Sequence, residues 1–165
     1  MKKKILIIQG SSLKKINIKT DTSFFLGLEA QRRSYQIYYY EPRDLSFING
    51  KVTALCSKVK FVDNSKKPVK VLKKKVLNLL QAKLILIRSE PPFNQQYINT
   101  TFILEHISKK VRIINYPKAL REVPEKLFSL RLTKFMPKTL ISENLNEIKS
   151  FLKRNKKIVM KPIES

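Results

Sequence analysis

Short apolar runs recur along the chain and are separated by stretches of mixed polarity. Residues 4–8 and 83–88 are rich in Ile and Leu and too short for buried helices, so both predict buried strands. Residues 36–40 and 111–114 predict two more strands of the same kind. No apolar run approaches the roughly 18–20 residues that a membrane-spanning helix needs, so no membrane association is expected.

Helical patterns occupy the intervals between these runs. Asp21 or Thr20 can cap a helix that continues to about Ser34. Apolar positions over 94–109 predict a second helix, and a short helix is expected at 117–122. Strands alternating with helices up to residue 120 predict an α/β domain with a parallel sheet. Such sheets bind ligands in the loops after their strands. Those loops are residues 9–22, 88–94 and 115–118.

Asn49 and Gly50 lie between apolar residues and predict a tight hairpin, because both residue types accept a positive φ. The chain then continues as a strand to about Asp63. Residues 66–82 are ambiguous between strand and helix. A heptad-like set of apolar residues favours a helix there: Val69, Leu72, Val76, Leu79 and Leu80.

The last part of the chain has a pattern of its own. Pro124 suits the beginning of a new helix, and residues 139–141 predict a short strand. Ser142 is expected to cap a helix that carries Leu145, Ile148 and Leu152 at helical spacing. The strand-like residues 155–161 follow that helix.

Composition adds an unusual charge. Thirty-five Lys and Arg face twelve Asp and Glu in 165 residues, a formal net charge of +23. Such a balance can indicate a polyanion partner such as RNA or DNA. The lysines are scattered, however, and no aromatic–basic stacking pattern accompanies them. A Lys-rich proteome bias is the favoured interpretation, and a nucleic-acid-binding protein is a disfavoured alternative.

Cys56 is the only cysteine, so an intrachain disulfide is excluded and a reducing, cytoplasmic location is expected. In a strand-like stretch it is expected to be a small core residue. His106, the only histidine, is expected on the 94–109 helix away from the ligand loops. Without a Cys or His cluster there is no zinc pattern, and without GxGxxG or Walker A there is no support for dinucleotide or P-loop binding.

Four blocks of sequence resemble one family. They are INIKTDTSFFLGLEAQRRS (16–34), IRSEPPFNQQYINTTFILE (87–105), INYPKALREVPEKLFSLRL (114–132) and IVMKPIES (158–165). Their content, order and approximate spacing are similar to those of bacterial glutathione synthetases, and the INGKV hairpin also matches. The resemblance covers nearly the whole chain, and four independent blocks make a chance match improbable.

The resemblance implies an ATP-dependent carbon–nitrogen ligase that joins γ-glutamylcysteine to glycine through an acyl phosphate, with magnesium on the nucleotide. It implies a Rossmann-like, pre-ATP-grasp substrate domain over residues 1–122. It also implies the beginning of an ATP-grasp lid domain over residues 123–165, and a homo-oligomer in the full-length enzyme. Positioning and charge neutralisation dominate phosphoryl transfer, which suits Lys, Arg and a metal.

The resemblance also assigns site residues. Lys126 and Lys161 match lysines that bind the nucleotide, each a point positive charge with three donors. The loop that faces the dipeptide is matched by Asn17, Ile18 and Asp21. Arg88 matches an arginine at a strand end, where a bidentate fork can hold a carboxylate. An ion pair with Glu90 or Glu41 is the alternative for Arg88. Asn115 and Arg121 either buttress the nucleotide side or serve loop packing and surface charge.

Departures from the family pattern limit these assignments. Pro124 stands where the family has Asn, and Ser34 where it has a helix-ending Gly. Gly10-Ser11-Ser12 replaces an acid–proline start of the first loop, which puts the dipeptide contacts in question. The metal-binding carboxylates, further arginines and most of the ATP-grasp fold are expected beyond residue 165, so the chain is expected to be an incomplete enzyme, inactive alone. A non-catalytic substrate-binding or oligomerisation module is the other alternative.

Overall fold

A computed structural model describes residues 4–64, 66–90 and 92–163. The chain separates into two compact units, Met1–Glu122 and Val123–Ser165. The strands of the first unit are β1 Ile5–Gly10, β2 Gln36–Tyr40, β3 Leu45–Ile48, β4 Lys51–Phe61, β5 Val69–Asn78, β6 Leu84–Arg88 and β7 Arg112–Ile114. Its helices are α1 Thr22–Arg32, α2 Gln95–Glu105 and α3 Pro117–Glu122.

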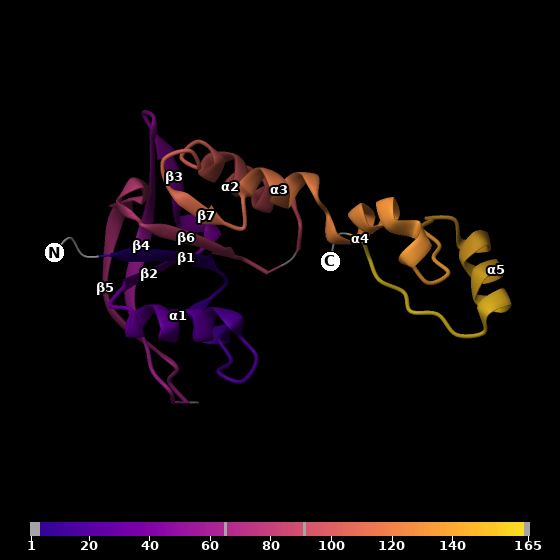
Figure 1. Ribbon diagram of the computed structural model, residues 1–165, viewed down its shortest axis with the longest axis horizontal. Helices are drawn as coiled ribbons and strands as arrows, with labels where there is room; N and C mark the ends of the chain where they lie inside the picture. Colours follow the sequence, from indigo (N-terminus) through magenta and orange to yellow (C-terminus); the bar gives the residue numbers. More distant parts are fainter. Residues whose placement is uncertain (1–3, 65, 91, 164–165) are drawn as a thin grey trace. The chain divides into compact units, whose positions relative to one another are not determined.

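The strands of the first unit form one sheet in the order β3-β4-β2-β1-β6-β7, with β5 paired to β4 (Figure 1). Strands β2, β1, β6 and β7 are parallel, which confirms the predicted α/β class. Strands β3, β4 and β5 add an antiparallel end, so the sheet as a whole is mixed. The β3–β4 hairpin turns at Asn49 and Gly50, with φ of 47° and 79°, as predicted.

Two apolar clusters cover the two faces of the sheet. Helix α1 lies on one face, and α2 and α3 lie on the other (Figure 1). On the α1 face, Phe24 packs with Ile8 and Phe61. On the α2 face, Leu104 packs with Ile7. Because alternate residues of a strand point to opposite faces, β1 contributes to both clusters and forms the centre of the core.

Helix α1 begins as the sequence predicts. The Asp21 carboxylate accepts a hydrogen bond from the Ser23 amide at 2.7 Å, which caps the helix. Gly27 faces the sheet, and a Cβ at this position would overlap the Phe61 ring. The glycine therefore allows α1 to approach β4 closely.

The predicted helix over residues 66–82 is wrong. Val69–Asn78 is the edge strand β5, paired with β4 over most of its length. The apolar residues that suggested a helix do not form one buried face, since Leu72 and Val76 are exposed. Pairing with β4, including a register shift between Lys58 and Val59, provides the backbone hydrogen bonds that decide the conformation.

The second unit contains α4 Glu125–Phe128, the 3-10 segment Ser129–Phe135 and α5 Leu145–Asn155. Helix α5 is where the sequence predicts it, but Asn144 caps it, and Ser142 accepts a hydrogen bond from the Asn144 amide. The predicted strands at 139–141 and 155–161 are wrong within the described residues, which pair neither segment with another strand. Val159 and Met160 are largely exposed.

None of the helices in the described ranges combines the length and the apolar composition needed to cross a bilayer.

Candidate functional site

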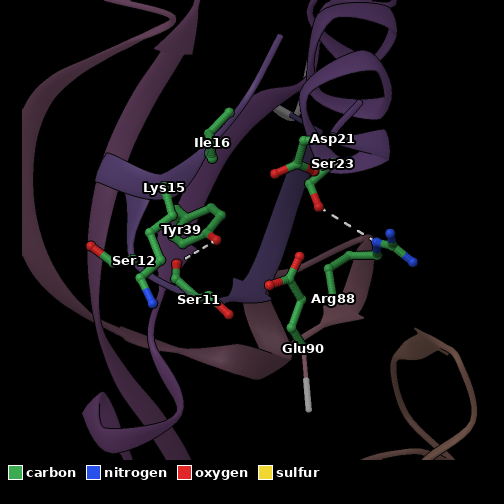
Figure 2. Close-up of a pocket in the computed structure, with 9 residues that line it drawn as sticks. All are labelled: Ser11, Ser12, Lys15, Ile16, Asp21, Ser23, Tyr39, Arg88 and Glu90. Atoms are coloured by element: carbon green, nitrogen blue, oxygen red, sulfur yellow. Dashed lines mark hydrogen bonds between the residues drawn. The ribbon is translucent and has the colours of Figure 1, made fainter. Parts of the chain in front are cut away.

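A small cleft lies at the C-terminal ends of the parallel strands β1 and β6 (Figure 2). Its volume is about 40 Å³, and it is lined by Ser11, Ser12, Lys15, Ile16, Asp21, Ser23, Tyr39, Arg88 and Glu90. The loop after β1, the start of α1, strand β2 and the end of β6 all contribute side chains. Two of the predicted loops, 9–22 and 88–94, therefore meet at one site, as expected for parallel strands.

Tyr39 forms one wall of this cleft. Its hydroxyl donates a hydrogen bond of 2.7 Å to the Ser11 carbonyl and so ties the loop after β1 to β2. The ring passes over Gly10, where any Cβ would overlap the hydroxyl. Burial raises the pKa of Tyr39 above its ordinary value, and the negative charges of Asp21, Glu41 and Glu90 raise it further. Tyr39 is therefore a neutral hydrogen-bond donor in the cleft.

Charges of both signs line the same cleft. Lys15 and Arg88 supply positive charge, and Asp21 and Glu90 supply negative charge. The Arg88 Nε donates to the Ser23 hydroxyl across 3.4 Å, a long hydrogen bond. Arg88 is the exposed last residue of β6, directly after three buried residues, so its guanidinium leaves a rigid strand at the cleft. This arrangement suits a ligand that has both a carboxylate and an ammonium group.

The alternative ion pairs for Arg88 are not observed. Glu41 pairs instead with Arg43, at 3.2 Å, and none of the ion pairs in the described part of the chain includes Arg88. Among the residues that the structure describes, the contact that holds the guanidinium is the long hydrogen bond to Ser23. Arg88 therefore lines the cleft without an ion pair to either of these carboxylates.

Of the predicted dipeptide loop, Asp21 lines the cleft, whereas Asn17 and Ile18 do not. The Asn17 side chain accepts from the Lys19 amide at 2.9 Å, and its carbonyl accepts from the Asp21 amide at 2.9 Å. Ile18 packs against the apolar cluster on the α1 face. Both residues shape the turn that delivers Asp21 to the cleft.

The two predicted nucleotide lysines lie in the second unit. Lys126 is in the short helix α4, and its Nζ donates to the Ile163 carbonyl at 3.3 Å. Lys161 is exposed in the extended segment two residues before Ile163. The segment that carries Lys161 therefore lies beside α4, and both ammonium groups are suited to phosphate oxygens.

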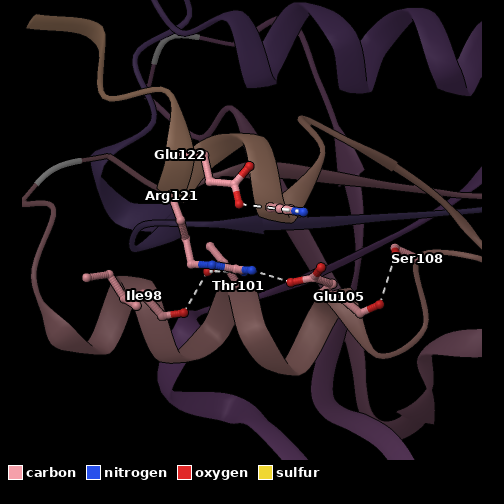
Figure 3. A network of polar contacts seen from close by, with 7 residues as sticks. Ile98, Thr101, Glu105, Ser108, Arg121 and Glu122 are labelled. Atoms are coloured by element: carbon pink, nitrogen blue, oxygen red, sulfur yellow. Dashed lines mark hydrogen bonds and ion pairs between the residues drawn. The ribbon is translucent and has the colours of Figure 1, made fainter. Parts of the chain in front are cut away.

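Arg121 holds α3 onto α2 (Figure 3). Its guanidinium donates to the Thr101 hydroxyl at 3.1 Å, forms an ion pair with Glu105 and lies 3.8 Å from the centre of the Phe102 ring. This accounts for Arg121 by packing within the first unit. Asn115 is exposed in the loop before α3. His106 follows α2, and its ring meets Phe47 edge-on with centroids 5.0 Å apart, outside the cleft.

Sequence reasoning missed several residues that line the cleft, namely Ser11, Ser12, Lys15, Ile16, Ser23 and Tyr39. The position of the loop after the first strand was the available signal for most of them. Tyr39 had no signal, because a tyrosine in a strand is commonly a core residue. Within the described ranges, no three His, Cys, Asp or Glu side chains are placed to hold a metal ion.

Comparison with known proteins gives two family matches. Residues 4–121 match the N-terminal domain of prokaryotic glutathione synthetase. Residues 125–165 match the ATP-grasp domain of prokaryotic glutathione synthetase. The two matches follow each other in the order of the two compact units of the chain.

Similar proteins carry the same name. Glutathione synthetase of Buchnera aphidicola subsp. Schizaphis graminum is 38% identical over 155 residues, which covers 93% of this chain and 48% of the relative. The Mesorhizobium japonicum protein is 37% identical over 163 residues, covering 99% and 52%. The protein of Escherichia coli O127:H6 is 37% identical over 150 residues, covering 90% and 48%. The chain spans about half the length of these curated relatives. With one family model matched to each part of its sequence, the chain belongs to the prokaryotic glutathione synthetase family.

Proposed function

We propose that this chain provides the dipeptide-binding domain and the first part of the nucleotide-binding domain of an ATP-dependent ligase. The reaction joins γ-glutamylcysteine to glycine through an acyl phosphate. The observation that carries this proposal is the pair of consecutive family matches over residues 4–121 and 125–165. Because the relatives are about twice as long, the complete reaction needs residues that this chain does not contain.

The charges of the cleft support a dipeptide ligand. γ-Glutamylcysteine has an α-ammonium group, an α-carboxylate and a second carboxylate. Arg88 is proposed to hold one carboxylate in a two-pronged hydrogen bond, and Asp21 to accept from the ammonium group. Lys15 and Glu90 supply a second charge of each sign. Asn17 and Ile18 are proposed to contribute to dipeptide binding by shaping the loop that carries Asp21 and through any contact that this loop makes with the dipeptide.

The second unit is proposed to begin the nucleotide site. Membership of the family implies the use of ATP and magnesium in general. Lys126 and Lys161 are proposed to bind phosphate oxygens, since each presents an ammonium group with three donors. The described residues offer no carboxylate cluster for magnesium. Bound ATP would supply the phosphoryl group and its metal would neutralise phosphate charge, and the part played by this chain is to place further positive charge where negative charge accumulates.

The remaining proposals concern the surroundings of the protein. A cytoplasmic enzyme is proposed, in agreement with the free, buried thiol of Cys56. A homo-oligomer is proposed for the full-length enzyme.

Titration calorimetry of the 165-residue polypeptide with γ-glutamylcysteine tests the binding role. We expect saturable binding that weakens about tenfold or more in Arg88→Ala, because a hydrogen bond to a charged group contributes about 1.5–3 kcal/mol. Arg112→Ala is the matched control, since Arg112 is also an exposed arginine of a parallel strand but lies outside the cleft. Equal affinity of the wild type and Arg88→Ala would remove Arg88 from the site.

Catalysis is tested separately. A fusion of this chain to the C-terminal half of the Escherichia coli relative is expected to form glutathione from γ-glutamylcysteine, glycine and ATP. The 165-residue polypeptide alone is expected to give no turnover. A fusion that folds, binds ATP and releases no phosphate in the presence of both substrates would contradict the proposed reaction.

A further inference from the structure

A chain of buried hydrogen bonds runs behind the cleft. Gln9, next to last in β1, has no exposed surface. Its Oε1 accepts a hydrogen bond of 2.8 Å from the Tyr40 hydroxyl, and its Nε2 donates one of 3.1 Å to the Ser89 hydroxyl. Tyr40 is itself 2% exposed. The three side chains therefore connect β2, β1 and the residue after β6 through one amide that is hydrogen-bonded at both ends.

The register of the sheet relates this chain to the cleft. Gln9 pairs with Tyr40, and the next residue, Gly10, pairs with Arg88. Alternate residues of a strand point to opposite faces, and Tyr40 belongs to the apolar cluster on the α2 face whereas Tyr39 belongs to that on the α1 face. The chain of hydrogen bonds therefore lies on the face of the sheet opposite to the wall of the cleft formed by Tyr39.

Ser89 connects the chain of hydrogen bonds to the cleft. It lies between Arg88 and Glu90, both of which line the cleft, and it is the end of the buried chain that leaves the core. Strand β6 ends at Arg88, so no ladder hydrogen bond continues the strand there. The partly buried hydrogen bond from Gln9 to Ser89 attaches this segment to the core.

We propose that Gln9 is a positioning residue, which acts through Ser89 to fix the direction in which Arg88 and Glu90 enter the cleft. This inference rests on the proposed binding of the dipeptide for its functional consequence. Its structural part, the direction of Arg88 and Glu90, does not depend on the dipeptide and can be tested at Arg88 in the free protein. Buried amides with both ends satisfied hold one geometry, because any rotation leaves a polar group without a partner.

Four variants separate the roles. Gln9→Leu removes both hydrogen bonds, and Ser89→Ala removes only the link to the cleft. Ser89→Thr keeps the hydroxyl, so it should keep the hydrogen bond to Gln9 and behave like the wild type. Tyr38→Phe is the matched control, because Tyr38 lies on the same strand and the same face as Tyr40 and is equally buried, but it is outside the chain of hydrogen bonds. If Gln9→Leu does not fold, Ser89→Ala still tests the proposal, because it changes a residue at the edge of the core.

The first measurement is the NMR signal of the Arg88 Nε–H group in the free protein. We expect it to shift or broaden in Gln9→Leu and Ser89→Ala, and to be unchanged in Ser89→Thr and Tyr38→Phe. An unchanged Arg88 signal in a folded Ser89→Ala would overturn the proposal, whether or not the dipeptide binds.

The second measurement is dipeptide affinity by calorimetry. Loss of a residue that orients a metal ligand typically costs about 10–100-fold in affinity, and we expect a weakening of the same order in Gln9→Leu and Ser89→Ala. The double variant Gln9→Leu/Ser89→Ala should bind no more weakly than Gln9→Leu, because both substitutions remove the same hydrogen bond between Gln9 and Ser89. Wild-type affinity in a folded Ser89→Ala would overturn the role in binding. Failure of the wild type to bind would instead contradict the proposed function.

Discussion

Gly10 and Tyr39 show how a single contact defines the edge of the cleft. The tyrosine ring crosses over the last residue of β1, and only a residue without a Cβ leaves room for it. The space gained lets the Tyr39 hydroxyl reach the Ser11 carbonyl. Glycine is thus required here by close approach of a side chain and not by backbone conformation.

Gly10→Ala is expected to lower the free energy of unfolding by about 1–3 kcal/mol, as insertion of a methyl group into a packed site does. Urea unfolding measures this change. In a Tyr39→Phe background the penalty should be smaller, since the hydroxyl that the new Cβ would overlap is absent. An equal penalty in both backgrounds would show that Tyr39 is not the obstacle.

Cys56 predicts how stability depends on pH. Burial, the largest cause, and the negative charge of Asp44 together raise the pKa of its thiol from 9.0 to about 12, while Lys75 opposes the change. The folded state therefore keeps a proton that the unfolded state loses. The stabilisation is complete below pH 9 and is lost as the pH rises towards 12, by up to about 1.4 kcal/mol per pH unit for this group.

Urea unfolding above pH 9 tests this dependence. The free energy of unfolding should decline less steeply with pH in Cys56→Ala than in the wild type. Parallel declines would exclude the thiol as the cause.

At the scale of elements, the sequence was most informative where local chemistry and tertiary packing agree. The capped helix α1 and the Asn49-Gly50 hairpin appear where the sequence predicts them. Strand β5 was predicted as a helix because its apolar spacing resembles a heptad, although most of its residues are exposed. Strand β5 is held by backbone pairing with β4, from which a loop separates it in the sequence. Such pairing cannot be read from the spacing of apolar residues.

The β4–β5 pair places like charges opposite each other. Lys58 faces Lys73 and Lys60 faces Lys70 in the ladder, whereas Lys74 faces Ser57. Directly opposed like charges destabilise a sheet. Lysine on an edge strand also discourages pairing with other chains. The same lysines that destabilise the sheet therefore protect it from aggregation.

Lys73→Glu is therefore expected to raise the free energy of unfolding by about 0.2–1 kcal/mol. Lys74→Glu makes the same change in net charge without removing an opposed pair, so it should give a smaller gain. Added salt should stabilise the wild type more than Lys73→Glu, because salt screens exposed charges. Chemical denaturation with urea at two salt concentrations measures both effects, and equal gains for the two variants would assign the effect to net charge alone.

At the scale of the whole molecule, the parallel strands and the α/β class could be predicted, and so could the meeting of loops 9–22 and 88–94. Asp21 and Arg88 were predicted site residues that the cleft brings together. Asn17 and Ile18 lie outside it because their contacts stabilise the turn. Gln9 and Tyr40 carried no sequence signal, since their connection depends on the register of β1 with β2.

The described buried residues all belong to the first unit, and none lies in 123–163. A polypeptide ending at Glu122 is therefore expected to keep its cooperative unfolding transition. Its free energy of unfolding should change by less than about 1 kcal/mol, because changes at exposed side chains have small effects on stability. Ending the chain at Tyr116 is the control. It removes Arg121 and its contacts with α2, and should lower stability clearly. A large loss on ending the chain at Glu122 would show that the second unit stabilises the first.

The absence of buried side chains among those described in 123–163 has a consequence for the lifetime of the polypeptide. Phe135, Leu145 and Val159 present large apolar surfaces on a segment with little to resist local opening. Chaperones and degradative proteases select substrates by such features. Turnover in a cell would therefore begin in this segment, and the abundance of the chain would depend on how much of the apolar surface is covered.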